Sequence, residues 1–170
     1  MEIALYKPEI PPNTGNIARL SVCTNSPLHI IDKPAFSMDE ASVRRAGLDY
    51  WDQVNLKLHE NWDKFLEHTQ KNEIPQRVLL FSKFGNVTYS SIEYQKDDIL
   101  VFGQETSGLP DFVIQNIVEK HPEHILRIPV REGCRSLNLA NAVALVLYEG
   151  LRQMNFPGLA QTFKVAELKA

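Results

Sequence analysis

The amino-acid sequence predicts an α/β fold, in which a mainly parallel sheet is flanked by helices. Residues 77–82 and 99–103 are almost entirely apolar, as strands buried on both faces of a sheet are. Strand-like segments alternate with helical ones along the chain, which is typical of parallel sheets. The chain has 170 residues, 44% of them hydrophobic and 23% charged, so one domain is expected.

Short apolar runs bounded by turn residues mark the expected strands. In order, they cover residues 3–6, 28–32, 54–58, 77–82, 99–103 and 125–128. Between them, polar residues that cap helices precede segments whose apolar residues share one face. The expected helices begin at Asn13 or Thr14, at Ser37 with Glu40 in a capping box, at Asn61, at about Asp111 and at about Asn138. Residues 8–12 contain three prolines and are expected to form an ordered loop.

The last expected helix, over residues 138–154, leaves almost no polar face for three turns. A helix that is apolar all round is buried all round. In so small a chain, one side can pack on the sheet while the other meets a second subunit, which favours a homodimer. The alternative is a helix covered by other elements of the same chain.

The composition excludes several classes of protein. The net charge is −3, so RNA would have to be held by local basic clusters or by a surface assembled from two subunits. Cys23 and Cys134 form no CxxC pair. His121 and His124 flank Pro122 in a polar stretch that we interpret as a solvated loop, so no metal is predicted. No signal peptide or apolar run of 18 residues is found, which predicts a soluble, cytoplasmic protein that is not bound to a membrane.

Three loops follow strands at the edge where ligands of parallel sheets bind, at residues 7–16, 103–110 and 129–138. Gly103 and Gly108 have the spacing of a phosphate-binding loop, but Leu109 and Pro110 follow in place of its lysine and hydroxyl residue. No GxGxxG follows a strand either. An NTPase and an ordinary dinucleotide-binding turn are therefore excluded, and backbone groups of irregular loops would have to hold a nucleoside-like cofactor.

The same loops carry a specific resemblance. Residues 13–19 (Asn-Thr-Gly-Asn-Ile-Ala-Arg), residues 102–109 (Phe-Gly-Gln-Glu-Thr-Ser-Gly-Leu), and Ile128-Pro129 with residues 136–142 (Ser-Leu-Asn-Leu-Ala-Asn-Ala) resemble, in order, the three motifs of the SpoU branch of the SPOUT RNA methyltransferases. The resemblance spans residues 1 to about 158. Residues 8–16 and 44–50 are similar to the minimal, single-domain members that modify the wobble-position ribose of leucine tRNAs.

This resemblance implies a single domain over residues 1–158 with a tail at 159–170, a C-terminal trefoil knot and a homodimer. It also implies methyl transfer from S-adenosyl-L-methionine, without a metal, to the ribose 2′-hydroxyl of the wobble cytidine or uridine derivative in tRNA, with no protein partner. Alternatives are methylation of another tRNA or rRNA site, or a non-catalytic RNA-binding dimer. Gln104 and Ser107 depart from the proline and arginine of the wobble enzymes.

Residue roles follow from the matching positions. The resemblance places the cofactor against Phe81, Gly103, Ile128 and Ser136, although Ser136 is also a candidate cap of the last helix. It assigns the chemistry to Arg19. Because arginine stays protonated, we expect Arg19 to orient the hydroxyl and stabilise the forming alkoxide rather than to act as a base. A surface salt bridge is the alternative.

Supporting roles are expected at Asn13, Asn16, Glu105, Asn138 and Tyr148. Asn13 and Asn16 either cap the first helix or orient substrate, and Glu105 holds Arg19 or the partner loop in place. Tyr148 would reach the site of a second subunit. RNA-binding residues are expected at Arg44, Arg45, Arg131 and Arg135, and ordinary solvated charge is the alternative for them.

Overall fold

A computed structural model of the chain describes residues 1–37, 50–71 and 75–162. In this part, seven parallel strands form one sheet in the order β3-β2-β1-β6-β4-β7-β5. The strands are β1 (Glu2–Tyr6), β2 (Leu28–Ile31), β3 (Leu56–His59), β4 (Val78–Phe81), β5 (Val87–Thr88), β6 (Ile99–Phe102) and β7 (Ile125–Arg127). The helices are α1 (Pro11–Thr24), α3 (Trp62–Thr69), α4 (Asp111–Val118), α5 (Leu139–Gln153) and the 3-10 turns η1 (Trp51–Gln53) and η2 (Pro122–His124).

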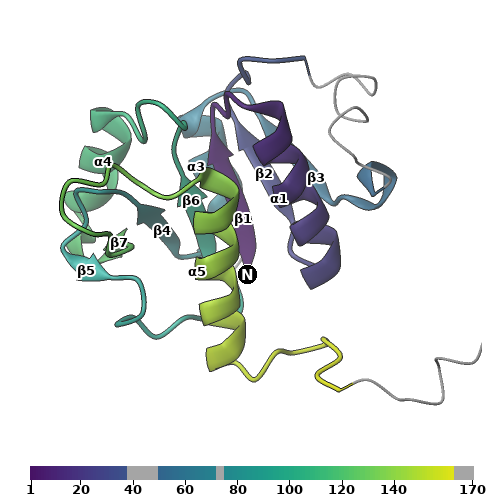
Figure 1. Ribbon diagram of the computed structural model, residues 1–170. Coiled ribbons are helices and arrows are strands. Elements are labelled where there is room, and N and C mark those ends of the chain that lie inside the picture. The colour runs from purple at the N-terminus through teal and green to yellow at the C-terminus, as the bar shows by residue number, and fades with distance from the viewer. Residues whose placement is uncertain (38–49, 72–74, 163–170) are drawn as a thin grey trace, which may run out of the picture.

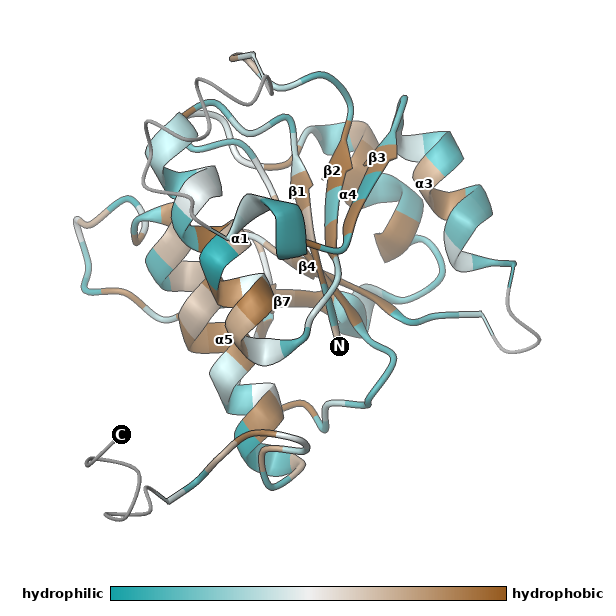
Figure 2. Ribbon diagram, turned by 90° about the vertical axis from the view of Figure 1, so that its right-hand side faces the viewer, coloured by the Kyte–Doolittle hydropathy of each residue, from teal (hydrophilic) through white to brown (hydrophobic). Residues whose placement is uncertain are grey.

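Helices cover both faces of the sheet (Figure 1). Alternate residues of the strands pack against α1 and α5 on one face and against α3 and α4 on the other. For example, Leu5 lies in the cluster with Ile17 and Val143, whereas its neighbour Ala4 lies in the cluster with Phe65. Figure 2 shows the hydrophobic residues concentrated along the central strands. A sheet buried on both faces explains the nearly continuous apolar strand sequences.

The predicted α/β class and parallel sheet are confirmed, and all the strands expected from sequence are present. Asn61 caps α3 as predicted, because its Oδ1 accepts a hydrogen bond of 2.9 Å from the backbone N–H of Lys64. The two-residue strand β5 and the two 3-10 turns were not predicted. The capping box of Ser37 with Glu40 cannot be compared, since residues 38–49 lie outside the described part.

The prediction for the start of α1 was wrong. The helix begins at Pro11 and not at Asn13 or Thr14, and its N-cap, Ile10, makes no side-chain capping bond. Prolines are tolerated in the first helical turn, because the N–H that proline lacks would have no partner there. Asn13 consequently lies inside the first turn, where its buried side chain is free to bond to other segments.

Helix α5 is present as predicted, but Ser136 is not its cap. Asn138 is the N-cap, and its Oδ1 accepts a 2.9 Å hydrogen bond from the backbone N–H of Ala140. One face of α5 packs on the sheet and on α1, while Leu145 and Tyr148 remain 38% and 45% exposed. The alternative that other elements of the same chain cover the whole helix is therefore wrong for the described residues. Among those residues, no helix combines the length and apolar character needed to cross a membrane.

Candidate functional site

A cavity of about 480 Å³ lies at the carboxyl ends of β4, β6 and β7. Three segments supply most of its lining, namely residues 81–84 after β4, 102–109 after β6 and 127–142 after β7. Ile10 and Asn13, at the start of α1, complete it. Because parallel strands end at one edge of the sheet, segments far apart in sequence meet here.

Two aromatic rings form part of the cavity lining. Phe81 of β4 and Phe102 of β6 are paired in register on neighbouring strands, and their rings stack with centroids 4.8 Å apart and an interplanar angle of 13°. Both side chains are largely buried, and Ile128 lines the same cavity. Such a surface suits a flat, apolar ligand face, while the backbone of the three segments supplies the polar groups.

Gly103 is required by a close approach of the backbone. The loop closes through two hydrogen bonds between Gln104 and Gly108, of 3.0 Å and 2.9 Å, and Gly108 has a φ of 74°. This turn places the carbonyl carbon of Gly108 only 2.2 Å from where a Cβ on Gly103 would stand. Any larger residue at position 103 would therefore displace the loop that lines the cavity.

The carboxylate of Glu105 joins the second loop to the first. Its Oε2 accepts a 2.8 Å hydrogen bond from the backbone N–H of Glu9, and its Oε1 accepts bonds from Ile10 N–H at 3.2 Å and from Asn13 Nδ2 at 3.0 Å. Hydrogen bonds to a charged acceptor are the strong ones. Glu105 thus holds a neighbouring loop of its own chain, and its hydrogen bonds within the described chain go to that loop rather than to Arg19.

Asn13 links the first loop to the third motif segment through a hydrogen bond to Asn138. Its Oδ1 accepts a 2.9 Å hydrogen bond from Asn138 Nδ2, while Asn138 Oδ1 caps α5. Each of the two amides therefore both donates and accepts, and the three motif segments are linked through Glu105, Asn13 and Asn138. Asn13 acts here as a bridge between segments and not as the helix cap that was weighed for it.

Glu9 was not identified from the sequence. Its carboxylate accepts hydrogen bonds of 3.0 Å from the backbone N–H of Thr106 and of 2.8 Å from the Thr106 hydroxyl. Glu9 and Glu105 thus bind each other's loops reciprocally. No local pattern predicts such a pair, because the partners are 97 positions apart in the chain.

The cavity brings together many of the predicted site residues and leaves others outside. Those that line it are Phe81, Gly103, Ile128, Ser136, Asn13, Glu105, Asn138 and Arg135. Those that lie outside the lining are Arg19, Asn16, Tyr148 and Arg131, all of them on described and exposed surface. Arg44 and Arg45 fall outside the described residues.

Arg19 occupies the exposed side of α1, with its guanidinium carbon 5.0 Å from the centre of the Tyr50 ring. Within the described chain it forms no salt bridge, so the alternative of a surface ion pair finds no support there. Arg19 and the cavity of its own chain are separate features of the surface.

The fold and the three joined motif segments define a methyltransferase domain of the SpoU type. The chain belongs to this family, since the SpoU rRNA Methylase family matches residues 1–148. A putative tRNA (cytidine(34)-2′-O)-methyltransferase of Listeria monocytogenes is 46% identical over 162 residues, covering 94% of this chain and 91% of the relative. The tRNA (cytidine(34)-2′-O)-methyltransferase of Methylovorus glucosotrophus is 41% identical over 92% of this chain and 97% of its own.

Solved structures agree with this assignment. A putative RNA methyltransferase from Bacillus anthracis superposes with a TM-score of 0.82 at 38% identity, covering 95% of this chain and 99% of that chain. A structure described as giving insight into the 2-OH methylation of C/U34 on tRNA has a TM-score of 0.79, also at 38% identity, over 91% and 95% of the two chains. The SpoU methyltransferase AviRb from Streptomyces viridochromogenes shares the fold, with a TM-score of 0.75 at 22% identity over 91% of this chain and 60% of that chain.

Proposed function

We propose that this protein transfers the methyl group of S-adenosyl-L-methionine to the ribose 2′-hydroxyl of the wobble nucleotide, cytidine 34, of tRNA. The observation that carries the proposal is a cavity that all three motif segments line, with Glu105, Asn13 and Asn138 linking the segments. Relatives named for this reaction are more than 40% identical over nearly the whole chain. We extend the proposal to a uridine derivative at the same position and to leucine tRNAs, because residues 8–16 resemble the enzymes that act on them.

The cavity fits the proposed cofactor in size and chemistry. Its volume of about 480 Å³ lies within the usual range for small-molecule sites. The stacked rings of Phe81 and Phe102, with Ile128, offer an apolar wall for the adenine, and Gly103 and Ser136 bring backbone and hydroxyl groups to its polar edge. The bound sulfonium supplies an activated methyl group, so the protein mainly has to align the ribose hydroxyl with it, and we propose a reaction without a metal.

Arg19 is the proposed catalytic residue, acting in the cavity of a second copy. It lies outside the cavity of its own chain, on the exposed face of α1. The helix α1 itself packs beside α5. There its fixed positive charge would orient the ribose hydroxyl and stabilise the alkoxide as it forms, while solvent or an RNA phosphate accepts the proton. Asn16, exposed on the same helix, and Tyr148 of α5 would accompany it.

The proposed homodimer uses the exposed apolar face of α5. Asn141, Leu145 and Tyr148 follow one another at helical spacing and are all exposed, and Leu137 is 43% exposed just before the helix. An apolar strip of this kind marks an interaction surface. Sedimentation at micromolar concentration is expected to give twice 19.4 kDa. A monomer that still methylates tRNA would contradict both the dimer and the shared site.

We also propose the C-terminal trefoil knot that the resemblance implies. Helix α5 returns to pack beside α1, although β7, which precedes it, lies on the other side of β6 and β4 in the sheet. The connecting segment therefore has to cross the loops after β4 and β6, which line the cavity with it. Pulling the chain from its two ends tests the proposal. A knotted chain stops short of the extended length of 170 residues, whereas an unknotted chain reaches it.

For the RNA we propose a discontinuous basic surface on the dimer. Arg135 lies at the rim of the cavity and Arg131 is exposed nearby in the same segment. Arg44 and Arg45 are proposed to contribute as well. Two copies of these arginines would offset the net charge of −3 locally. We propose that the enzyme acts in the cytoplasm, on tRNA present there.

The test is methyl transfer in vitro. The purified protein is incubated with labelled S-adenosylmethionine and unmodified leucine tRNA, and the product is mapped by nuclease digestion and mass spectrometry. We expect one methyl group on the ribose of nucleotide 34 and no transfer to a matched tRNA that carries 2′-deoxycytidine there. Methylation at another tRNA or rRNA site would replace the proposed substrate. Tight tRNA binding without any transfer would show a non-catalytic RNA-binding dimer.

A further inference from the structure

A group of potential metal ligands lies on the connection between α4 and β7. His121, Glu123 and His124 each offer one ligand atom, and the three atoms all lie within 4.8 Å of one another. The 3-10 turn η2, which begins at Pro122, fixes their spacing, and the backbone N–H of His121 is anchored to Ile117 O at 2.8 Å. Our interpretation of this stretch as a solvated loop considered the two histidines and left Glu123 out.

The distances within the group are compatible with an ion site. Glu123 Oε1 lies 3.4 Å from His121 Nδ1 and 3.6 Å from His124 Nε2. The first contact is a long hydrogen bond, and the second is longer than a nitrogen–oxygen hydrogen bond. Ligands held about 2.0–2.2 Å from a tetrahedral zinc ion, in contrast, are separated from each other by roughly 3.3–3.6 Å. The two separations from Glu123 Oε1 match edges of such a tetrahedron, and the two histidine nitrogens lie within 4.8 Å of each other.

We propose that His121, Glu123 and His124 form a divalent transition-metal site that takes Zn²⁺, with solvent in the fourth position. Two imidazoles and one carboxylate are a ligand set that zinc prefers. The His124 side chain is only 13% exposed and provides a fixed ligand, whereas those of His121 and Glu123 are 54% and 59% exposed and can turn onto the ion. The two imidazole rings stack on one another, with centroids 4.7 Å apart, so the exposed His121 ring would have to turn for both nitrogens to face one ion.

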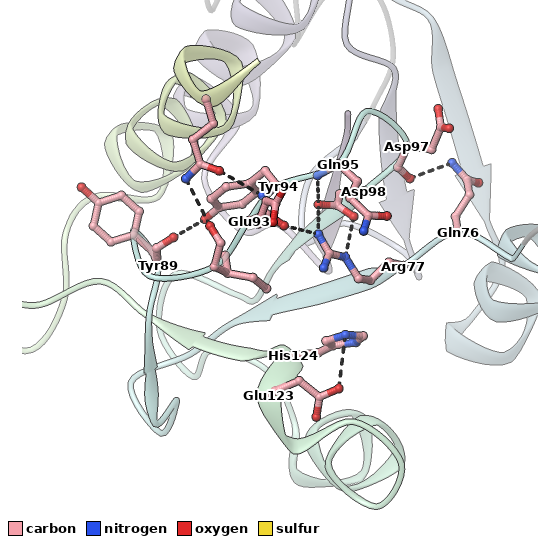
Figure 3. A network of polar contacts seen from close by, with 12 residues as sticks. Gln76, Arg77, Tyr89, Glu93, Tyr94, Gln95, Asp97, Asp98, Glu123 and His124 are labelled. Atoms are coloured by element: carbon pink, nitrogen blue, oxygen red, sulfur yellow. Dashed lines mark hydrogen bonds and ion pairs between the residues drawn. The ribbon is translucent and has the colours of Figure 1, made fainter. Parts of the chain in front are cut away.

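The position of the site indicates a structural role. The triad precedes β7, whereas Arg127 and Ile128, at the other end of this three-residue strand, line the cavity. In Figure 3, His124 and Glu123 lie beside the ion pair of Arg77 with Asp98, which joins the amino ends of β4 and β6 through two bonds of 2.7 Å. A bound ion would tie the end of α4 to the start of β7, about 10 Å from the reacting edge.

The test is calorimetric titration of the full chain with ZnCl₂ after removal of metals by a chelator. We expect saturation at one Zn²⁺ per chain in the micromolar range, and a rise in melting temperature with Zn²⁺. Glu123→Gln and His124→Gln should each weaken Zn²⁺ binding by more than about tenfold. Loss of a group that only orients a metal ligand already lowers the affinity about tenfold or more. Two control variants should bind as the wild type does: Glu119→Gln, an exposed acid close by, and His68→Gln, in a separate histidine cluster.

Several results would overturn the proposal. One is the absence of saturable binding at one equivalent. Another is equal affinity in the wild type and both triad variants, and a third is loss of binding in His68→Gln, which would move the ion to the other cluster. Because Glu123 is exposed, Glu123→Gln is expected to fold, so its result is informative even if His124→Gln is unstable. Cobalt gives a second measurement, since four-coordinate Co²⁺ absorbs visible light far more strongly than the hydrated ion.

Discussion

Replacing Glu105 with glutamine tests the connection between the motif segments. The carboxylate accepts three hydrogen bonds, two at Oε1 and one at Oε2. The glutamine amide has a single oxygen. If this oxygen takes the place of Oε1, it keeps the hydrogen bonds from Ile10 and Asn13. The NH₂ group then faces the backbone N–H of Glu9, so two donors meet where the shortest bond, of 2.8 Å, had been.

The size of the effect follows from these bonds. A lost hydrogen bond to a charged group costs about 1.5–3 kcal/mol. The hydrogen bond to Ile10 is exposed, so water compensates for part of its weakening. We therefore expect the free energy of unfolding to decrease by about 2 kcal/mol in total. For a domain of this size, that lowers the melting temperature by roughly 4–8 °C. Displacing the cavity loop by about 1 Å would lower the rate of methyl transfer about 10²-fold.

The assays are thermal unfolding and single-turnover methylation. Glu67→Gln is the matched control, because Glu67 is an exposed acid whose hydrogen bonds go to Lys64 on the same helix. It should change the free energy of unfolding by less than about 0.5 kcal/mol. If Glu105→Gln melts at the same temperature as Glu67→Gln and methylates at the full rate, the Glu105 carboxylate does not hold the site together.

Four further predictions concern separate parts of the molecule. Gly103→Val should abolish binding of S-adenosylmethionine in calorimetry, since a Cβ would stand 2.2 Å from the loop backbone, and unchanged binding would place the cofactor elsewhere. Arg19→Ala should slow methylation about 10²- to 10³-fold with cofactor affinity intact, and Arg19→Lys should rescue poorly; parallel loss of both would make Arg19 structural. Leu145→Asp should yield the 19.4 kDa monomer in sedimentation, and an intact dimer would move the interface away from α5. Burial lowers the pKa of His59 from 6.5 to about 4, so between these pH values only the unfolded state gains a proton at this side chain. The free energy of unfolding, measured by urea titration at several pH values, should therefore decrease on acidification, and it should decrease less steeply in His59→Gln. The same pH dependence in both proteins would contradict this.

The acid sensitivity should involve a larger buried cluster. His29 is fully buried and bonds through Nδ1 to His59 Nε2 at 2.8 Å and through Nε2 to the Glu2 carboxylate. Hydrogen bonds from His29 and Lys57 hold the pKa of Glu2 far below its usual value, against the opposing effect of burial. Burial also lowers the pKa of His68. The lowered pKa of Glu2 stabilises the folded state at neutral pH, and this stability is lost as the carboxylate gains a proton in acid. The lowered pKa values of His59 and His68 instead destabilise the folded state as pH falls below 6.5, because protons bind the unfolded state first.

The sequence alone predicted much of the fold, because buried parallel strands and capped helices leave local patterns. The error at α1 shows the limit of this reasoning, since Pro11 and Pro12 are equally compatible with a loop and with a first helical turn. The strand order β3-β2-β1-β6-β4-β7-β5 depends on contacts between distant segments, and no local pattern encodes it.

The candidate site, like the fold, contains residues that the sequence predicted and residues that only the structure revealed. Gly103 and Glu105 were identified through motifs, and the structure adds the reasons for both, namely a backbone 2.2 Å from a would-be Cβ and three hydrogen bonds. Glu9 was missed because its partner, Thr106, lies in another loop. Glu123 was missed because a carboxylate between two histidines becomes notable only once distances of 3.4 Å and 3.6 Å are known.

The proposed reaction is tested most directly by mapping ribose methylation in tRNA from cells that lack this gene. Mass spectrometry of isolated leucine tRNAs should show the 2′-O-methyl group missing from nucleotide 34 alone. The wild-type gene should restore it, and Arg19→Ala, at equal protein level, should not. Full methylation of nucleotide 34 in the deletion strain, with a methyl group missing from another RNA position, would contradict the proposed substrate.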